Sequence, residues 1–456
     1  MCTKPISDRI EKRVLYISYS FPPSGGSAVQ RPLKFTKFLS DFGWKVHVVS
    51  VKKDYFLFDF ELRKEIPDKT SVTEAFSLEP SILKIILKRK YKKFYRWKFA
   101  SLIMNFFLKI YSVIFYRLVI IDWCDGWVPF GFLKAKKIMR KENVDLILVS
   151  MEPSSACIIG ILLKKITGKP LVLDYHDAWT TSVPFGQRNG LRKKISEMLE
   201  NYVINFADKI IACKTDIIFD IQRKFGSLDD QKFVLIRNGY DADDYSGVKK
   251  KENKKFVITY TGKLSEKLYY SPETFINALS QFIRENQIPK NDICVLFVGL
   301  ISKNYKNRFA ELIKKLNIED IVITTGNVDH TKCIEYQKNS DLLLYIIESI
   351  DGKKASYKFS GVIPAKIYEY IYSGTPILAI APPGFEVDLI NKTKTGFVAE
   401  PNNIKSVKKV LFKIYKKYKS GQLFIDPNME EIRKYDRREL TKKLAGVLDE
   451  VVSHSN

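Results

Sequence analysis

A histidine followed at once by an aspartate stands just after a short hydrophobic run. The segment reads LDYHDAWT, and a strand is predicted over residues 171–174. His176 and Asp177 therefore emerge at a strand end, and a histidine suits hydrogen bonding or proton exchange near neutral pH. We interpret His176 and Asp177 as catalytic candidates. The alternative is a His–Asp pair that only stabilises the fold.

A glutamate and a lysine three positions apart lie in the segment KFSGVIPAKIYEYIYSGTPILAI. A helix is predicted over residues 364–372, preceded by a loop that contains Gly361. Lys366 and Glu369 are then neighbours on one side of this helix. The functional interpretation is a carboxylate that accepts two ribose hydroxyls, with the helix N-terminus facing a phosphate. The alternative is an exposed ion pair, worth under about 1 kcal/mol.

Two glycine-containing turns follow predicted strands. The loop FPPSGGSAVQR contains Gly25 and Gly26, which allow a ligand to approach the backbone, before a helix N-terminus suited to anions. The turn YTGKLSEK places Lys263 and Lys267 after Gly262. Two ammonium groups there would hold a diphosphate, each charge-assisted hydrogen bond contributing roughly 1.5–3 kcal/mol. Alternatively, the first loop is a turn without a ligand, and the lysines only solvate the surface.

The elements that position these residues alternate between strands and helices in both halves of the chain. Strands are predicted in the first half over residues 14–18, 46–51, 145–150, 171–174, 209–212 and 233–236. In the second half they are predicted over residues 257–260, 294–298, 321–324, 342–346 and 376–380. Apolar residues at helical spacing (Phe35, Phe38, Leu39 and Phe42) lie between the first two strands and end at Gly43. This βαβ pattern predicts parallel sheets covered by helices on both faces.

The chain is therefore predicted to form two facing α/β domains, each a Rossmann-like, doubly wound parallel sheet. We expect an N-terminal domain over residues 1–237 and a turn-rich, charged linker over 238–255. A C-terminal domain follows over 256–430, and a final helix over 431–456 is expected to pack back on the first domain. Ligands of such sheets bind at the carboxyl ends of the strands.

A basic and apolar segment over residues 84–121 interrupts the alternation. From Lys88 to Lys98 the sequence KRKYKKFYRWK holds seven basic and four aromatic residues, and a mostly apolar stretch follows. Polar residues recur there at helical spacing, which predicts an amphipathic helix. One interpretation is an interfacial anchor on an anionic membrane. The other is a helix packed on the N-terminal domain.

Composition limits the class of protein. The 456 residues include 76 Lys and Arg against 51 Asp and Glu, a net charge of +25, which predicts an anionic partner. Six scattered cysteines without a C-x-x-C pair argue against a zinc site or a disulfide scaffold and favour a reducing compartment. The charged N-terminus predicts no secretory signal.

Asp241 and Asp243 resemble a metal-binding D-x-D but lie in a turn, so no metal is predicted.

The quoted segments, in this order, resemble the retaining glycosyltransferases of family 4, also called group 1, which have the GT-B fold. FPPSGGSAVQRPLKF is similar to their first loop and helix, YTGKL to their donor-phosphate turn, and PAKIYEYIYSGTPILAI to their nucleotide-binding helix. The stretch ending in DYHDAW is similar to that of bacterial cell-surface sugar transferases, and IRNGYDADDY resembles the element joining the two domains.

The resemblance implies transfer of a hexosyl or other glycosyl group from a nucleotide-sugar, with retention and without a metal or other cofactor. Glu369 would bind the ribose, Lys263 and Lys267 the diphosphate, and Gly25 and Gly26 the reacting end of the donor or acceptor. His176 with Asp177 would contact the sugar or acceptor. Donor-binding roles are also expected for Gly361, which stands where many members have a second glutamate, and for Lys366.

The implied partners are a nucleotide-sugar donor, a glycan or lipid-linked acceptor and an anionic membrane surface. The expected setting is surface polysaccharide or lipopolysaccharide synthesis by a cytoplasmic enzyme, peripheral at the inner face of the cell membrane. Two rivals remain: a GT-B-like protein that binds a ligand without activity, and a basic nucleic-acid binder. Since no nucleic-acid motif is present, we predict no nucleic-acid partner.

Overall fold

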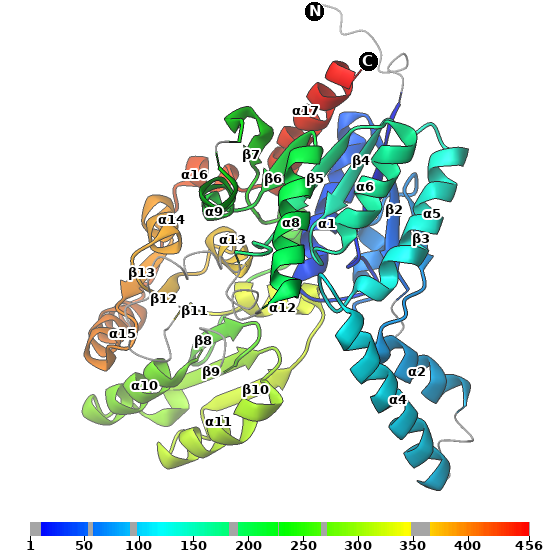
Figure 1. The fold of residues 1–456 in the computed structure, drawn as a ribbon. Helices are drawn as coiled ribbons and strands as arrows, with labels where there is room; N and C mark the ends of the chain where they lie inside the picture. The colour runs from blue at the N-terminus through cyan, green and yellow to red at the C-terminus, as the bar shows by residue number, and fades with distance from the viewer. Residues whose placement is uncertain are drawn as a thin grey trace, which may run out of the picture. The chain divides into compact units, whose positions relative to one another are not determined.

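The computed structural model describes residues 11–52, 58–91, 98–181, 190–226, 228–265, 271–347 and 365–455. It divides the chain into two compact units (Figure 1). Unit 1 comprises Met1–Arg237 and Leu440–Asn456, and unit 2 comprises Asn238–Glu439.

Unit 1 is built on a parallel sheet of seven strands in the order β3-β2-β1-β4-β5-β6-β7. The strands are β1 (Lys12–Ile17), β2 (Trp44–Val51), β3 (Ser71–Ala75), β4 (Leu146–Ser150), β5 (Leu171–Tyr175), β6 (Lys209–Ala212) and β7 (Phe233–Leu235). The central strands are buried on both faces, which explains their continuous hydrophobic runs. The order reverses between β1 and β4, so ligands are expected at the carboxyl ends of these two strands.

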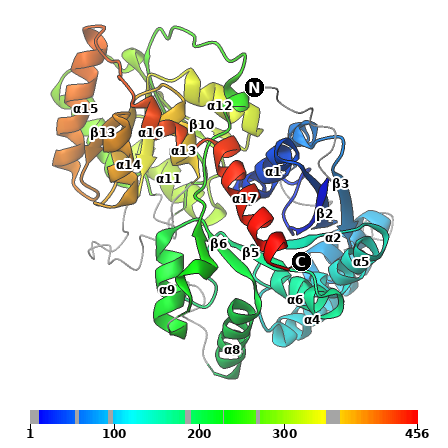
Figure 2. The same cartoon turned by 90° about the horizontal axis from the view of Figure 1, so that it is seen from above.

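Helices cover both faces of this sheet. One face packs on α1 (Ser27–Leu39) and on the part of α17 (Arg437–Ser455) that belongs to unit 1, and Figure 2 shows α17 alongside the strands. The other face packs on α5 (Val128–Lys141), α6 (Ala156–Thr167), α8 (Leu191–Phe206) and α9 (Thr215–Phe225). Two further helices, α2 (Pro80–Lys90) and α4 (Lys98–Leu118), project from the body of unit 1 (Figure 1).

The C-terminal helix is bound to unit 1 by apolar and polar contacts. Leu444 and Leu448 are fully buried in the same cluster as Val14 of β1. Asp449 adds two contacts, since its Oδ1 lies 2.7 Å from Lys12 Nζ and accepts a 3.1 Å hydrogen bond from the Trp44 indole. The chain thus returns to the first unit at its end.

Unit 2 contains a parallel sheet of six strands in the order β10-β9-β8-β11-β12-β13. They are β8 (Phe256–Thr261), β9 (Ile293–Val298), β10 (Val322–Gly326), β11 (Leu342–Ile346), β12 (Ile377–Ile380) and β13 (Gly396–Ala399). One face packs on α10 (Glu273–Glu285), α11 (Lys303–Lys315) and α15 (Ile404–Lys419). The other packs on α13 (Lys366–Tyr372), α14 (Phe385–Thr393) and α16 (Met429–Arg433). The order reverses between β8 and β11.

The two doubly wound parallel sheets predicted from the sequence are confirmed. Two edge strands, β3 and β13, were missed. Three of the five residues of β3 are exposed, and β13 has four residues and begins at Gly396, so neither gives a strong hydrophobic pattern. The Asp241 side chain accepts a 3.0 Å hydrogen bond from the Asp243 amide at the start of a 3-10 turn in unit 2.

Candidate functional site

In unit 2, the carboxylate of Glu369 is held by two side chains of α12 (His330–Lys338). Nε2 of His330 lies 3.0 Å from Oε1, and the Gln337 amide donates a 2.8 Å hydrogen bond to Oε2. His330 and Gln337 are seven residues apart, or two helical turns, and so share one face of α12. The Glu369 side chain is 18% exposed, so the carboxylate is held mostly inside unit 2.

A second layer of contacts fixes the residues that hold Glu369. The Tyr245 hydroxyl lies 3.1 Å from Oε1 of Gln337 and 2.8 Å from the Glu369 carbonyl oxygen. Nδ1 of His330 lies 3.8 Å from Oδ2 of Asp244, so the imidazole stands between two carboxylates. The orientation of the Glu369 carboxylate is therefore set by side chains of unit 2.

The amine of Lys366 lies beneath the turn that ends β8. Its Nζ donates a 3.1 Å hydrogen bond to the Thr261 carbonyl oxygen and stands 3.6 Å from the centre of the Tyr260 ring. Burial lowers the pKa of Lys366 to about 7, against the opposing effects of Cys333 and Glu369. The alternative of an exposed ion pair does not describe Lys366. An anion bound nearby would stabilise its charged form.

The turn itself depends on two glycines with positive φ. Gly262 has φ +122°, and Gly299, which follows β9, has φ +136°. A Cβ on Gly299 would lie 2.3 Å from the Gly262 carbonyl oxygen, so the two backbones touch. Lys263 is exposed next to this contact. Lys267 and Gly361 lie outside the described residues, and their predicted roles stay predictions.

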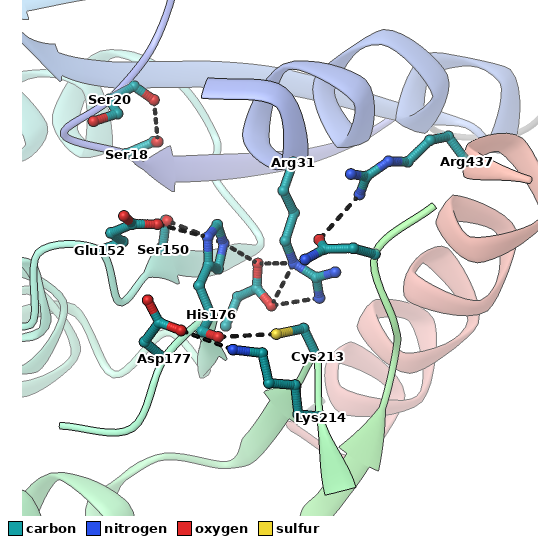
Figure 3. A network of polar contacts seen from close by, with 12 residues as sticks. Ser18, Ser20, Arg31, Ser150, Glu152, His176, Asp177, Cys213, Lys214 and Arg437 are labelled. Carbon is teal, nitrogen blue, oxygen red and sulfur yellow. Dashed lines mark hydrogen bonds and ion pairs between the residues drawn. The ribbon is translucent and has the colours of Figure 1, made fainter. Parts of the chain in front are cut away.

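In unit 1, a buried arginine–carboxylate pair connects α1 to β5 (Figure 3). Arg31 Nε lies 2.9 Å from Oδ2 of Asp174, and Nη2 lies 2.7 Å from Oδ1, a bidentate geometry. The two side chains are 2% and 1% exposed. Arg31 also donates a 3.0 Å hydrogen bond to the Arg237 carbonyl oxygen. Burial alone would raise the pKa of Asp174, but Arg31, followed by His176, holds it well below its usual value.

His176 continues this network toward the surface. Its Nε2 lies 3.1 Å from Oδ2 of Asp174, and its Nδ1 lies 3.2 Å from Oε2 of Glu152 in the loop after β4. Burial alone would lower the pKa of His176, but Asp174 and the hydrogen bond to Glu152 raise it to about 9. His176 is therefore a cation at neutral pH. In this state it donates hydrogen bonds and does not accept a proton.

Asp177 is not the partner of His176. Its Oδ1 lies 2.9 Å from Nζ of Lys214, which follows β6, and its side chain is 67% exposed. The Cys213 thiol donates a 2.9 Å hydrogen bond to the His176 carbonyl oxygen, which fixes the backbone between them (Figure 3). The alternative of a His176–Asp177 pair that only stabilises the fold does not fit the structure, because the two side chains contact different residues. Their catalytic role stays a prediction.

Gly25 and Gly26 lie in the loop between β1 and α1. Gly26 is exposed with φ +99°, and no atom lies within 4 Å of where its Cβ would be. Only its backbone conformation therefore requires glycine. This loop, Glu152, His176 and Lys214 all follow the carboxyl ends of strands in unit 1, at the edge where ligands of such sheets bind.

Several functional candidates were not identified from the sequence. They are Arg31, Glu152 and Asp174 in unit 1, and His330 and Gln337 in unit 2. Asp174 carried a usable signal, since an aspartate inside a buried hydrophobic strand needs a cationic partner. His330 and Gln337 carried none, because their role depends on the packing of α12 against α13.

Comparisons with known proteins agree with this fold. Residues 241–431 match the family model "Glycosyl transferases group 1", and residues 109–244 match "Glycosyltransferase Family 4". No curated protein matches the chain. Among solved structures, Anabaena Alr3699/HepE in complex with UDP and glucose is similar with a TM-score of 0.62 and 16% identity, covering 96% of this chain and 100% of that one.

Two further solved structures are similar over nearly their whole length. Sucrose-phosphate synthase from Thermosynechococcus elongatus has a TM-score of 0.63 and 14% identity, covering 97% of this chain and 100% of that one. WaaG, a glycosyltransferase involved in lipopolysaccharide biosynthesis, has a TM-score of 0.55 and 15% identity, covering 95% and 99%. At these identities the likeness shows the fold alone.

Proposed function

We propose that this chain, which has the GT-B fold and carries glycosyltransferase group 1 and family 4 domains, transfers a sugar from a nucleotide-diphosphate donor to a hydroxyl acceptor. The observation that carries the proposal is the carboxylate of Glu369, oriented by His330 and Gln337 and 18% exposed. A carboxylate in this setting accepts hydrogen bonds from the two adjacent hydroxyls of a ribose.

The diphosphate would lie beside the Gly262 turn. Lys366 and Lys263 provide charge there, and the missing side chain of Gly262 allows a phosphate to approach the backbone. The leaving group develops negative charge as the sugar–oxygen bond breaks, and oriented cations stabilise that charge in the transition state. UDP bound to Anabaena Alr3699/HepE, which is similar in fold, supports a nucleotide donor.

We propose that the transfer retains the anomeric configuration. The bond between the anomeric carbon and the diphosphate oxygen breaks, and the acceptor oxygen bonds to the same face of that carbon. The acceptor proton passes to the departing phosphate oxygen, so the reaction balances without a protein base. The cationic state of His176 fits this scheme, because a protonated imidazole has no lone pair with which to accept the acceptor proton.

The acceptor is proposed to be a glycan on a lipid carrier, in surface polysaccharide or lipopolysaccharide synthesis at the cytoplasmic face of the membrane. Similarity in fold to WaaG supports this setting. The reaction is proposed to need no metal, because lysines at the Gly262 turn neutralise the leaving group.

The experiment is a transfer assay. The purified protein is incubated with radiolabelled UDP-glucose, UDP-galactose, UDP-N-acetylglucosamine or GDP-mannose, with a bacterial lipid extract as acceptor and EDTA present. We expect one donor to label the lipid fraction, and NMR of the product to show the donor's anomeric configuration. Nucleotide binding without any transfer or donor hydrolysis would favour the inactive, ligand-binding alternative.

A further inference from the structure

One face of α4 is apolar and exposed over its whole described length. The window Ser101–Leu118 has a mean hydropathy of 1.3, and only 6% of it is buried. Phe106 and Phe107 are each 61% exposed, and Leu102 and Leu118 are 67% and 73% exposed. The face also includes Ile103, Ile110, Val113 and Ile114. An exposed apolar surface along one face of a helix indicates a binding surface.

The opposite edge of α4 attaches the helix to unit 1. Leu108 is buried, and the Tyr111 hydroxyl donates a 2.6 Å hydrogen bond to the Leu78 carbonyl oxygen. At 100° per residue, Leu108 lies about 160° around the helix from both Phe106 and Ile110. The helix is thus held along one edge with its apolar face turned outward. The alternative that this face packs on the N-terminal domain does not hold for the described residues of α4.

The segment from the start of α2 to the end of α4, which we call the α2–α4 hairpin, is also strongly basic. Residues 80–121 contain ten Lys or Arg and no Asp or Glu. Lys84, Lys88 and Lys90 on α2 are exposed, as is Lys109 on α4. A one-signed charge of this size beside an apolar face complements an anionic bilayer, whose headgroups attract the lysines while the acyl region accepts the aromatic and aliphatic side chains.

The geometry favours binding in the plane of the bilayer over crossing it. Helix α2 has 11 residues and spans about 16 Å, whereas the hydrocarbon core is about 30 Å thick. The chain leaves unit 1 through α2 and returns through α4, so a crossing would have to carry the seven basic residues from Lys88 to Lys98, both included, through that core. An apolar face on one side only is also the pattern of an interfacial helix.

We propose that the α2–α4 hairpin is a membrane-docking element that lies on an anionic bilayer, with Leu102, Phe106, Phe107 and Ile110 inserted among the lipids. Lys84, Lys88 and Lys90 contact the headgroups. Docking is inferred from the surface of the hairpin alone. The role of docking in reaching a lipid-linked acceptor rests on the proposed function.

The experiment is co-sedimentation of the full chain with vesicles of phosphatidylcholine alone or mixed with phosphatidylglycerol. We expect at least tenfold tighter binding to the anionic vesicles. The face variant Phe106→Ser/Phe107→Ser/Ile110→Ser and the charge variant Lys88→Glu/Lys90→Glu are each expected to weaken binding at least tenfold. Raised salt should weaken the wild type and have less effect on the charge variant.

Matched controls lie outside the hairpin. Phe219→Ser on α9 and Phe412→Ser on α15 remove aromatic side chains that are 65% and 52% exposed, and Lys314→Glu/Lys315→Glu on α11 reverses two exposed charges. These variants should bind vesicles like the wild type. The proposal would be overturned if the face and charge variants bound vesicles as tightly as the wild type. It would also be overturned if alkaline carbonate failed to extract the wild type from vesicles, because that result indicates a spanning helix.

A second measurement separates docking from the proposed function. Thermal stabilisation by UDP, GDP and ADP is recorded for the same hairpin variants. We expect it to be unchanged, which also shows that the variants are folded. Vesicle binding without stabilisation by any nucleotide would leave docking intact and count against the donor site.

Discussion

Nε2 of His176 lies 3.1 Å from Oδ2 of Asp174, the carboxylate that also binds the Arg31 guanidinium in a bidentate manner. The three side chains form a buried network of alternating charges. Arg31 belongs to α1, Asp174 to β5, and His176 to the loop after β5. Asp174 therefore has two functions, since it neutralises Arg31 and keeps His176 protonated. The histidine at the ligand-binding edge of unit 1 is thus a cationic hydrogen-bond donor.

Asp174→Asn should destabilise unit 1 by about 3–5 kcal/mol, because it leaves the buried Arg31 charge without a counter-ion. Glu61→Gln is the matched control. Glu61 pairs with Lys64 at the surface, where the side chains are 52% and 73% exposed, and its loss should change stability by less than about 1 kcal/mol. Urea unfolding measures both effects. Equal effects of the two substitutions would contradict the assignment of Arg31–Asp174 as a buried pair.

The stability of unit 1 should depend on the protonation of His176. Its folded pKa of about 9 lies above its ordinary value of 6.5. The stabilisation is therefore full below pH 6.5 and is lost as pH rises through 9, at up to about 1.4 kcal/mol per pH unit. The measurement is urea unfolding at intervals between pH 6 and pH 10 for the wild type and His176→Gln. The difference between the two curves should decrease across this range, and a constant difference would refute the raised pKa.

Affinity for the donor should fall with rising pH because of Lys366. Its pKa of about 7 in the free protein means that, above this pH, binding a diphosphate requires proton uptake. The dissociation constant for a nucleotide-sugar should then rise by up to tenfold per pH unit above 7. Lys366→Arg stays charged, so it should bind the donor tightly and without this pH dependence. Lys366→Met should lose both the affinity and its pH dependence. Calorimetric titration at pH 6, 7, 8 and 9 measures the dissociation constants. A steep pH dependence of affinity in the Lys366→Met variant would show that it does not arise from Lys366.

His330 is expected to act as a positioning residue for Glu369. His330→Ala removes the 3.0 Å contact to Oε1 and should weaken nucleotide binding by roughly 1.5–3 kcal/mol, the range of a hydrogen bond to a charged group. His330→Gln, which can still donate, should recover much of the loss. Lys332→Ala on the same helix is a useful comparison, because Lys332 is 56% exposed and pairs with Glu335. Similar loss in the Gln and Ala variants would indicate a merely structural role.

The fold was predictable because its buried strands carry unbroken hydrophobic runs between helical segments. Central strands such as β6 (Lys209–Ala212) and β11 (Leu342–Ile346) were located at their bounds. The edge strand β3 was not, because it has exposed residues at most positions and lacks that pattern. Pattern-based inference is therefore strongest where both faces of a strand are buried.

The candidate site was predictable only in part. Glu369 and Lys366 were found because they occupy a helix after a glycine-containing loop, and His176 because it follows a strand. Their partners depend on tertiary packing. Asp177 is adjacent to His176 in sequence, yet Asp174 and Glu152 are its contacts in space. Likewise, nothing in the sequence placed His330 beside a glutamate 39 residues away.

The most direct test of the proposed donor site is calorimetric titration of UDP, GDP and ADP into the wild type and Glu369→Gln in EDTA. The control is Glu335→Gln on α12, a glutamate whose side chain is 40% exposed and pairs with Lys332. The proposed site predicts that one nucleotide binds and that Glu369→Gln weakens it by about 10- to 30-fold, or roughly 1.4–2 kcal/mol, while the control is unchanged. Equal affinity in all three proteins would contradict the assignment of Glu369 as the ribose ligand, and with it the donor site in unit 2.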